Sequence, residues 1–403
     1  MSRRVFSIPS WALPLLALAG GILALAWLPL TSNGAGSPPP ATAGPAHAAT
    51  PSSSEEPSRP FLRGMTVTCP RHGEIWGSPA MGDALDQLRD LGVGSVAIHP
   101  YARIERDGTV RHRPAAGTGY LGRAASIARQ HEMALFWKPH LAYWGNYEWR
   151  GEIGFGDDEA AWQRFFDTYR AFIVDQAAFA AQVGVPLFAV GVELEKTVHR
   201  EAQWREVIAA VRQVYPGQIT YAANWDGVEN VPFWDAVDVL GVQAYFPLAD
   251  GPLADGPLAD GPLSDGSPSA GSLDGRDSAS RELRSKLQLK LESSWDRHLA
   301  QLETLSRDHG GLPVLFTEIG YNRSSKAAWE PWSYQVENNS QTRILRVQLM
   351  ETALRRAQRA PFVSGLFWWK WMPGHSAGRS NFSMRDAEAR DVLRRHWATT
   401  TAR

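Results

Sequence analysis

Short apolar runs alternate with longer amphipathic stretches from Phe61 onward, which is the pattern of repeated β/α units. The apolar runs predict eight strands, over residues 63–68, 93–99, 134–140, 186–193, 218–224, 237–245, 313–318 and 365–369. Amphipathic stretches over residues 81–91, 159–183, 201–214 and 342–357 predict helices between them. Eight such units predict an α/β fold, a single-domain (β/α)8 TIM barrel that spans residues 61–400.

The N-terminal segment has the pattern of an export signal. Arg3 and Arg4 precede an apolar run over about residues 5–30, and a stretch rich in Pro, Ala, Ser and Gly follows to residue 60. We expect residues 1–30 to be a signal peptide, or a membrane anchor because the run approaches the roughly 20 residues that span a bilayer. Residues 31–60 are expected to form a disordered linker. The pattern predicts an exported protein, secreted, periplasmic or membrane-anchored, with the barrel outside the cytoplasm.

One segment breaks the β/α rhythm. Residues 247–271 contain a five-residue repeat of the type Pro-Leu-Ala-Asp-Gly, which has no apolar face to bury. The repeat predicts a flexible, low-complexity loop insertion at about residues 249–275, after the sixth strand. Its aspartates are five residues apart, which is not the spacing of an EF-hand calcium loop.

Composition excludes some partners and leaves others open. The 403 residues carry a formal net charge of −1, so the sequence gives no electrostatic reason to expect nucleic acid as a partner. Cys69 is the only cysteine, which excludes an intramolecular disulfide and a cysteine-based metal site. The 17 tryptophans either fill the core of a large domain or stack on sugar rings. We expect no metal or cofactor, and the sequence leaves the oligomeric state open.

Two glutamates, Glu193 and Glu318, stand at the predicted ends of strands four and seven. Catalytic groups of a TIM barrel project from these strand ends. Two-residue alternation puts Gly191 on the face of Glu193 and Phe316 on the face of Glu318, so we expect both carboxylates to face the barrel mouth. Glycoside hydrolysis needs one carboxyl to protonate the leaving oxygen and a second to attack the anomeric carbon or activate water. A structural ion pair is the alternative for each glutamate alone, and Glu195 is a rival acid/base on the face of Glu193.

Other strand ends carry polar and aromatic side chains that we expect to bind substrate. Taken singly, each of them is more often structural than functional, and their clustering at one end of the barrel favours function. The predicted substrate-binding residues are Lys138, His140, Asn224, Trp225, Tyr245, Trp369 and Trp371. A tyrosine such as Tyr245 beside a nucleophilic carboxylate would donate a hydrogen bond that keeps the carboxylate ionised and oriented.

Five short motifs resemble those of glycoside hydrolase family 113, the β-mannanase family in a large clan of retaining barrel enzymes. They are Lys138-Pro139-His140, Gly191-Val192-Glu193-Leu194, Thr220-Tyr221-Ala222-Ala223-Asn224-Trp225, Ala244-Tyr245-Phe246-Pro247-Leu248 and Phe316-Thr317-Glu318-Ile319-Gly320-Tyr321. The resemblance covers essentially the whole predicted barrel. Val192 is a departure, because many members of the wider clan have Asn immediately before the acid/base.

The resemblance implies a retaining glycoside hydrolase, endo-β-1,4-mannanase-like, that cleaves a polysaccharide or oligosaccharide by double displacement. By that resemblance Glu193 is the acid/base, Glu318 is the nucleophile and Tyr245 is the partner of the nucleophile. The sugar subsite that it implies is lined by His140, Asn224 and Trp369. No metal or cofactor takes part in such a mechanism.

Two other function classes remain as alternatives. A catalytically silent carbohydrate-binding barrel on the cell surface would keep the aromatic side chains but would not need both Glu193 and Glu318. A metal-dependent barrel hydrolase would use His99 or His140 as ligands, but the chain has no His-x-His at a strand end and no His-Glu-x-x-His motif. The paired glutamates therefore favour the glycosidase, while the sugar and the choice between endo and exo action stay open.

Overall fold

The computed structural model describes residues 60–69, 72–251, 274–337, 339–374 and 381–398. The predicted signal or anchor over residues 1–30, nearly all of the predicted linker over residues 31–60 and most of the repeat insertion lie outside these ranges. Within the described ranges, no helix is both long and apolar enough to cross a membrane.

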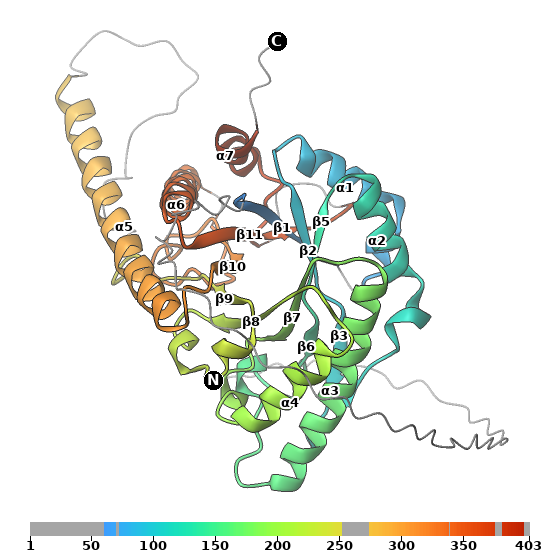
Figure 1. Cartoon of the computed structure of the whole chain (residues 1–403). Coiled ribbons are helices and arrows are strands. Elements are labelled where there is room, and N and C mark those ends of the chain that lie inside the picture. Colours follow the sequence, from blue (N-terminus) through green and yellow to red (C-terminus); the bar gives the residue numbers. More distant parts are fainter. Residues whose placement is uncertain (1–59, 70–71, 252–273, 338, 375–380, 399–403) are drawn as a thin grey trace, which may run out of the picture. The chain divides into compact units, whose positions relative to one another are not determined.

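Eight parallel strands close into a barrel in the order β1-β11-β10-β9-β8-β7-β5-β2 (Figure 1). The strands are β1 (Leu62–Val67), β2 (Ser95–Ile98), β5 (Ala134–Trp137), β7 (Leu187–Val192), β8 (Gln218–Asn224), β9 (Val239–Gln243), β10 (Val314–Ile319) and β11 (Val363–Trp371). Each of them overlaps one predicted strand. The predicted (β/α)8 TIM barrel is therefore confirmed.

A second, three-stranded sheet has the order β4-β3-β6 and was not predicted. Its strands are β3 (Tyr101–Ile104), β4 (Val110–Arg111) and β6 (His140–Ala142). It forms because the predicted third strand is interrupted at Pro139, which has no N–H to donate to a neighbouring strand. Beyond that proline, His140 pairs with Tyr101 in parallel and leaves the barrel. The small sheet thus extends the barrel at the ends of β2 and β5.

Seven α-helices in the described part of the chain surround the barrel, and four of them match the predicted helices to within two residues at each end. They are α1 (Pro79–Arg89), α2 (Tyr120–Gln130), α3 (Glu159–Gln182), α4 (Glu201–Arg212), α5 (Asp274–Asp308), α6 (Ser340–Arg359) and α7 (Ala387–Trp397). Short 3-10 helices lie in the loops, at η1 (Glu74–Gly77), η2 (Ala115–Thr118), η3 (Arg150–Glu152), η4 (Glu195–Thr197), η5 (Val228–Asn230) and η6 (Trp234–Ala236).

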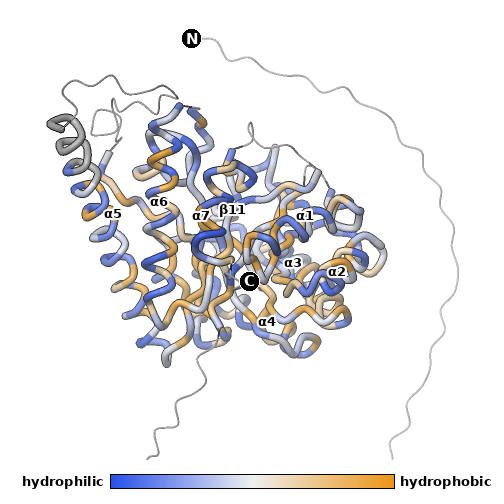
Figure 2. Tube along the Cα trace, turned by 90° about the horizontal axis from the view of Figure 1, so that it is seen from above, coloured by the Kyte–Doolittle hydropathy of each residue, from blue (hydrophilic) through white to orange (hydrophobic). Residues whose placement is uncertain are grey.

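The longest helix, α5, was not predicted, although it has 35 residues. It begins directly after the repeat, and its N-terminal end extends past the neighbouring α6 in Figure 1. Its buried side chains are three or four residues apart, which makes one apolar helical face: Leu287, Leu291, Trp295, Leu299 and Leu302. Charged residues between them hid this face in the sequence. The neighbouring helix α6 also mixes hydrophilic and hydrophobic residues along its length (Figure 2).

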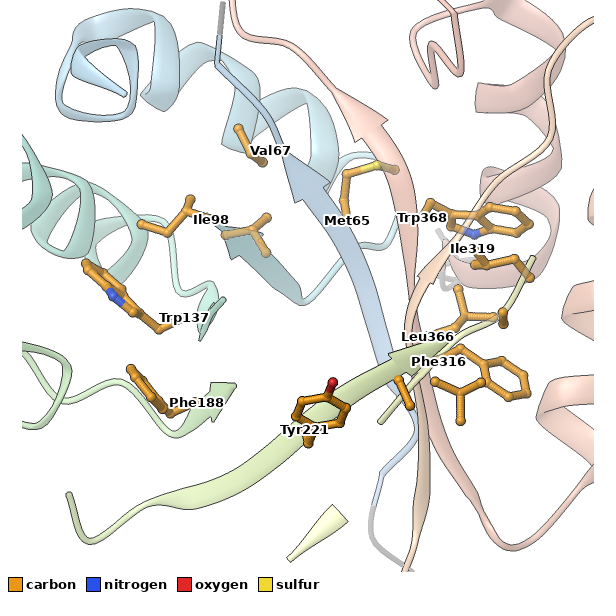
Figure 3. Close-up of a cluster of buried hydrophobic side chains, with 14 of the residues drawn as sticks. Met65, Val67, Ile98, Trp137, Phe188, Tyr221, Phe316, Ile319, Leu366 and Trp368 are labelled. Atoms are coloured by element: carbon orange, nitrogen blue, oxygen red, sulfur yellow. The ribbon is translucent and has the colours of Figure 1, made fainter. Parts of the chain in front are cut away.

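Two apolar clusters stabilise the barrel. The smaller fills the interior and consists of Ala97, Phe136, Leu187, Ala189, Val192, Ala222, Val239, Leu315 and Phe367, with Leu62 packed against it. The larger lies between the strands and the helices, and Figure 3 shows members such as Trp137, Phe188 and Trp368. Eight of the 17 tryptophans are among the fully buried side chains, so the core accounts for about half of the tryptophan excess. Each large apolar side chain so buried contributes about 1.5–3 kcal/mol to stability.

Irregular pairing changes which residues face the interior near the ends of β7 and β10. In β7 the register against β8 shifts between Ala189 and Gly191, so that Ala189 and Val192 both join the interior cluster. Gly191 faces the helices instead, where an added Cβ would lie 2.7 Å from Trp204 of α4. The predicted shared face of Gly191 and Glu193 is therefore wrong. A β-bulge changes the direction of the side chains that follow it, and this one lies directly before Glu193.

The same correction applies to β10. Its register against β9 shifts between Phe316 and Glu318. Phe316 packs outward on Trp295 of α5, with ring centroids 5.9 Å apart, whereas Glu318 lines the cavity described below. The predicted shared face of Phe316 and Glu318 is wrong, but the predicted direction of the carboxylate is the one observed.

Candidate active site

A cavity of about 1750 Å³ opens at the C-terminal ends of the barrel strands. It is larger than the roughly 300–1,000 Å³ typical of sites for drug-sized ligands, so it has room for an oligosaccharide. The predicted site residues that line it are His140, Glu193, Asn224, Trp225, Tyr245, Glu318 and Trp369. Lys138 is fully buried beneath the cavity and contacts Glu318.

Glu318 is held by one donor on each carboxylate oxygen. The Nζ of Lys138 donates to Oε1 of Glu318 and to the Thr317 carbonyl oxygen, which is 3.1 Å away. The Tyr245 hydroxyl donates to Oε2 of Glu318 at 3.2 Å. Burial raises the pKa of Tyr245 well above its usual value, and the charge of Glu318 adds to that rise. Tyr245 is therefore a neutral donor, and both oxygens of Glu318 have a fixed direction.

Glu193 has a separate set of partners. Its Oε2 accepts a hydrogen bond from Arg150 Nη1 at 2.6 Å, and its Oε1 accepts one from Gln243 Nε2 at 3.1 Å. The Thr317 hydroxyl donates to Gln243 Oε1 at 2.9 Å, which turns the amide so that its NH₂ group faces Glu193. Thr317 thus links the two glutamates, since it precedes one of them and orients the partner of the other.

The backbone at Glu193 is in the left-handed region, with φ of 55°. A side chain with a Cβ adopts this conformation at a cost of about 1–3 kcal/mol, and such residues cluster at functional sites. Here the backbone N–H of Glu193 still pairs with the Ala222 carbonyl at 2.9 Å, so the strand end stays attached to the barrel. The turn redirects the Glu193 side chain into the cavity.

Arg150, Gln243 and Thr317 were not among the predicted site residues. Two-residue alternation along β9 puts Gln243 on the face of Gly241 and Tyr245, so the sequence does carry a signal for it. Arg150 comes from the short helix η3 in the long loop between β6 and α3, where no periodic pattern points to its role. Its guanidinium packs on the ring of Tyr143, 5.5 Å from the centroid. The role of a loop residue such as Arg150 can be recognised only from the folded structure.

His140 lies at the cavity floor, and neither of its ring nitrogens has a hydrogen-bond partner among the described residues. It stacks on His99, with centroids 5.0 Å apart and ring planes 19° from parallel. Burial lowers the pKa of both imidazoles well below the usual value, and nearby cations such as Lys138 and Arg150 lower it further. Both rings are therefore neutral, and His140 can donate to or accept from a sugar hydroxyl.

This histidine pair predicts acid sensitivity. Because the folded-state pKa of each lies below the unfolded value of 6.5, protons taken up by the unfolded chain favour unfolding. The contribution to stability is complete above that value and is lost as the pH falls through it. Between pH 7.5 and 5.5 we expect the free energy of unfolding to fall, because both histidines take up a proton more readily in the unfolded chain than in the folded one. In His140→Asn, urea unfolding at both pH values should show about half of this fall in the free energy of unfolding, because only one histidine of the pair remains. An unchanged pH dependence in the variant would contradict the assignment.

Exposed aromatic rings stand at the rim of the cavity. Trp332 is 45% exposed and stacks on Trp225, with centroids 6.1 Å apart and planes 17° from parallel. Trp144 is 56% exposed and leans on Tyr101, 5.4 Å away. Deeper in the cavity, Trp369 lies under the Nζ of Lys370, 5.4 Å from its ring centroid. Flat rings in these positions can stack on the C–H faces of sugars.

Trp371 does not line the cavity, which corrects its prediction as a substrate-binding residue. It is 1% exposed and belongs to the core between the barrel and the helices. Regular alternation along β11 would put Trp371 on the face of Trp369. In the structure, Thr66 pairs with Trp369 and Val67 with Trp371, so Lys370 is an extra residue that shifts the register. The bulge turns Trp371 away from the cavity.

Asn224 and Glu195 also line the cavity, and they contact each other. Asn224 Nδ2 donates to Glu195 Oε2 at 3.4 Å. Glu195 opens the short helix η4, two residues beyond Glu193. Because Glu195 also lines the cavity, it remains an alternative to Glu193 as the acid/base. Among the described residues, no three His, Cys, Asp or Glu side chains gather as a metal site would require.

Solved structures of similar fold are glycoside hydrolases. A family 113 β-1,4-mannanase complex has a TM-score of 0.67 at 20% identity, with 84% of this chain and 99% of that chain covered. The family 113 β-mannanase of Alicyclobacillus acidocaldarius, solved in complex with ManMIm, has a TM-score of 0.65 at 23% identity, with 84% and 97% covered. The β-glucuronidase of Ruminococcus gnavus has a TM-score of 0.53 at 12% identity, with 84% and 50% covered. At these identities the likeness shows the shared barrel fold.

Sequence comparison assigns the family. A search of curated proteins finds no match for this sequence. The model of Glycoside Hydrolase Family 113 matches residues 70–383, which is well over half of the 403 residues and includes every predicted site residue. The chain therefore belongs to glycoside hydrolase family 113 and is a glycoside hydrolase.

Proposed function

We propose that the protein is a retaining, endo-β-1,4-mannanase-like glycosidase with Glu318 as nucleophile and Glu193 as acid/base. The observation that carries this proposal is that both glutamates reach one cavity, each held by its own donors. Double displacement needs one carboxylate that stays ionised for attack and a second carboxyl that gives up a proton and takes one back. Because Glu318 and Glu193 have different hydrogen-bond partners, the two carboxyl groups lie in different environments within one site.

In the first step, an oxygen of Glu318 attacks the anomeric carbon, and Glu193 gives its proton to the departing glycosidic oxygen. Lys138 and Tyr245 fix the carboxylate of Glu318, so less orientational freedom is lost at the moment of attack. In the second step, Glu193 takes a proton from water, whose oxygen replaces Glu318 on the anomeric carbon. Two inversions at that carbon give net retention.

Arg150 and Gln243 position the acid/base. They hold its two oxygens from different elements, Arg150 from a loop helix and Gln243 from β9. A side chain on a left-handed turn at a strand end would otherwise be free to rotate toward solvent. The pair therefore fixes both carboxylate oxygens of Glu193 within the cavity that Glu318 also lines.

The proposed substrate comes from the family, and the shape of the cavity is compatible with it. Two solved family 113 structures are described as a β-1,4-mannanase and a β-mannanase. The cavity, about 1750 Å³ in volume, has exposed tryptophans on different loops at its rim, Trp144 and Trp332. Both rings line the same cavity as the two glutamates, so a polymer that stacks on them would lie in the cavity with the glutamates, which supports cleavage within a chain.

A reducing-end assay over mannan, glucomannan, xylan and cellulose tests the substrate. We expect mannan and glucomannan to be cleaved with a kcat/KM at least about tenfold above that of xylan or cellulose, a difference of about 1.4 kcal/mol in transition-state binding. Proton NMR of the first product should show the β-anomer. A first-formed α-anomer would rule out retention, and a preference for xylan or cellulose would rule out the proposed sugar.

A further inference from the structure

We propose that the three-stranded sheet β4-β3-β6 forms an anion-binding wall of the cleft, which takes the carboxylate of a uronic acid unit on the polysaccharide. The inference rests on the proposed function, since that function places a polysaccharide in the cleft. It adds a substrate feature that the catalytic glutamates do not determine.

The small sheet is anchored by buried apolar side chains and carries arginines that line the cavity. Ala102 and Ile104 of β3 are buried in the core between the barrel and the helices. The alternate residues Tyr101 and Arg103 line the cavity, together with Arg111, which pairs with Arg103 across β3 and β4. The buried face fixes the sheet, so the two guanidinium groups are presented from a rigid support rather than from a loose loop.

The two guanidinium groups have spare hydrogen-bonding capacity. The Nε atoms of Arg103 and Arg111 approach the same oxygen of Glu105, at 3.4 Å and 3.6 Å. Neither side chain donates a hydrogen bond of normal geometry to any other described residue. One carboxylate balances two cations, so a positive charge remains, and each guanidinium offers five N–H donors in a planar fork that matches a carboxylate.

Their exposure makes the existing ion pairs weak. The side chains of Arg103 and Arg111 are 59% and 69% exposed, where such pairs contribute little to stability. A ligand carboxylate that accepts from both guanidiniums can therefore replace the long contacts with Glu105. Arg113, farther along the chain after β4, also lines the cavity and forms no ion pair with the described residues.

The wall lies next to the catalytic centre. Tyr101 pairs with His140 at the cavity floor, and Arg103 pairs with Ala142, two residues farther along. Two residues of a strand span about 7 Å, so the backbone of Arg103 lies about that far from the backbone of Tyr101, which contacts His140. Trp144, beside Tyr101, supplies an exposed ring on which a sugar can stack while the arginines hold its carboxylate.

The cavity lining also contains acidic side chains. The segment after β8 brings Asp226 to the cavity lining, and Glu195 lies within contact of its neighbour Asn224. A carboxylate on the substrate is therefore favoured beside β3 and β4 and disfavoured beside Asp226. This asymmetry would fix both the side and the register at which an acidic unit is accepted.

The test compares a mannan that bears glucuronosyl units with the same polymer after reduction of its carboxyl groups. We expect the protein to have a kcat/KM about tenfold higher on the acidic polymer at low salt, equivalent to about 1.4 kcal/mol. In the double variant Arg103→Gln/Arg111→Gln this ratio should fall to about 1. The matched control Arg89→Gln/Arg394→Gln removes two cations from exposed surface ion pairs away from the cavity, and it should keep the ratio of the unsubstituted protein.

Calorimetric titration with a glucuronosyl-bearing manno-oligosaccharide and its carboxyl-reduced form separates this inference from the proposed function. Tighter binding of the acidic form, lost in the double variant, supports the wall even if mannan is not cleaved. Equal binding of both forms by the unsubstituted protein, or a preference that survives in the double variant, overturns the wall even if mannan is cleaved. A preference lost equally in the control variant would indicate a general charge effect and would also overturn it.

Discussion

Glu318→Ala should abolish polysaccharide hydrolysis, with a loss of kcat on the order of 10⁴-fold or more. The variant removes the oxygen that would form the glycosyl–enzyme bond, and it leaves Lys138 and Tyr245 with no carboxylate to hold. The measurement is release of reducing ends from mannan at saturating substrate. A variant that keeps near-normal activity would exclude Glu318 as the nucleophile.

Chemical rescue identifies the role of the missing group. In Glu318→Ala, azide can occupy the vacated space and attack the anomeric carbon of an activated aryl β-mannoside, while Glu193 still protonates the leaving group. We expect a glycosyl azide of the α configuration, since only one inversion takes place. The matched control is Glu330→Ala, which removes a carboxylate from a partly buried pair with Lys326 and should behave as the unsubstituted protein. A β-azide from Glu318→Ala would assign Glu318 to the other role.

The barrel could be predicted from the sequence because each strand is a short apolar run that is buried on both faces. In β7, for example, all six residues are buried, so the run stands out whichever way its side chains point. Helix α5 was missed for the opposite reason. It buries one narrow stripe, and charged residues on its other faces hide that stripe in the sequence.

The direction of side chains at the strand ends was less predictable than the strands. Regular alternation failed at three places, before Glu193, before Glu318 and at Lys370, because each strand gains an irregular pairing near the cavity. For the two glutamates the prediction still reached the observed direction, although the faces assigned to Gly191 and Phe316 were wrong. For Trp371 the same irregularity turned a predicted cavity residue into a core residue.

Contacts that loops make with the site residues could not be predicted from the sequence. Arg150 lies 43 residues before Glu193 in the chain, and the packing of η3 against η4, which follows Glu193, brings its guanidinium within 2.6 Å of that carboxylate. The pairing of β3 with β6, which forms the proposed anion-binding wall, depends on the interruption at Pro139. Neither contact has a periodic signature, because both join segments that are far apart in the sequence.

The assignment of the acid/base can be decided between Glu193 and Glu195. Glu193→Ala should lower kcat/KM on mannan by about 10²–10⁴-fold, because the departing sugar oxygen is a poor leaving group without a proton. An aryl β-mannoside with an acidic phenol needs no such help in the first step. It should therefore give a burst of phenol followed by slow turnover, since the glycosyl–enzyme then waits for water without a base.

Azide completes the comparison. In Glu193→Ala it should restore steady-state turnover of the aryl substrate and give the β-configured azide, the product of two inversions at the anomeric carbon. In the matched variant Glu195→Ala, which removes the carboxylate that accepts from Asn224 instead, we expect no burst and no rescue. The left-handed turn at Glu193 and its two donors support this outcome. A β-azide formed by Glu195→Ala, with Glu193→Ala unresponsive, would transfer the acid/base role to Glu195 and leave Glu193 to position its neighbours.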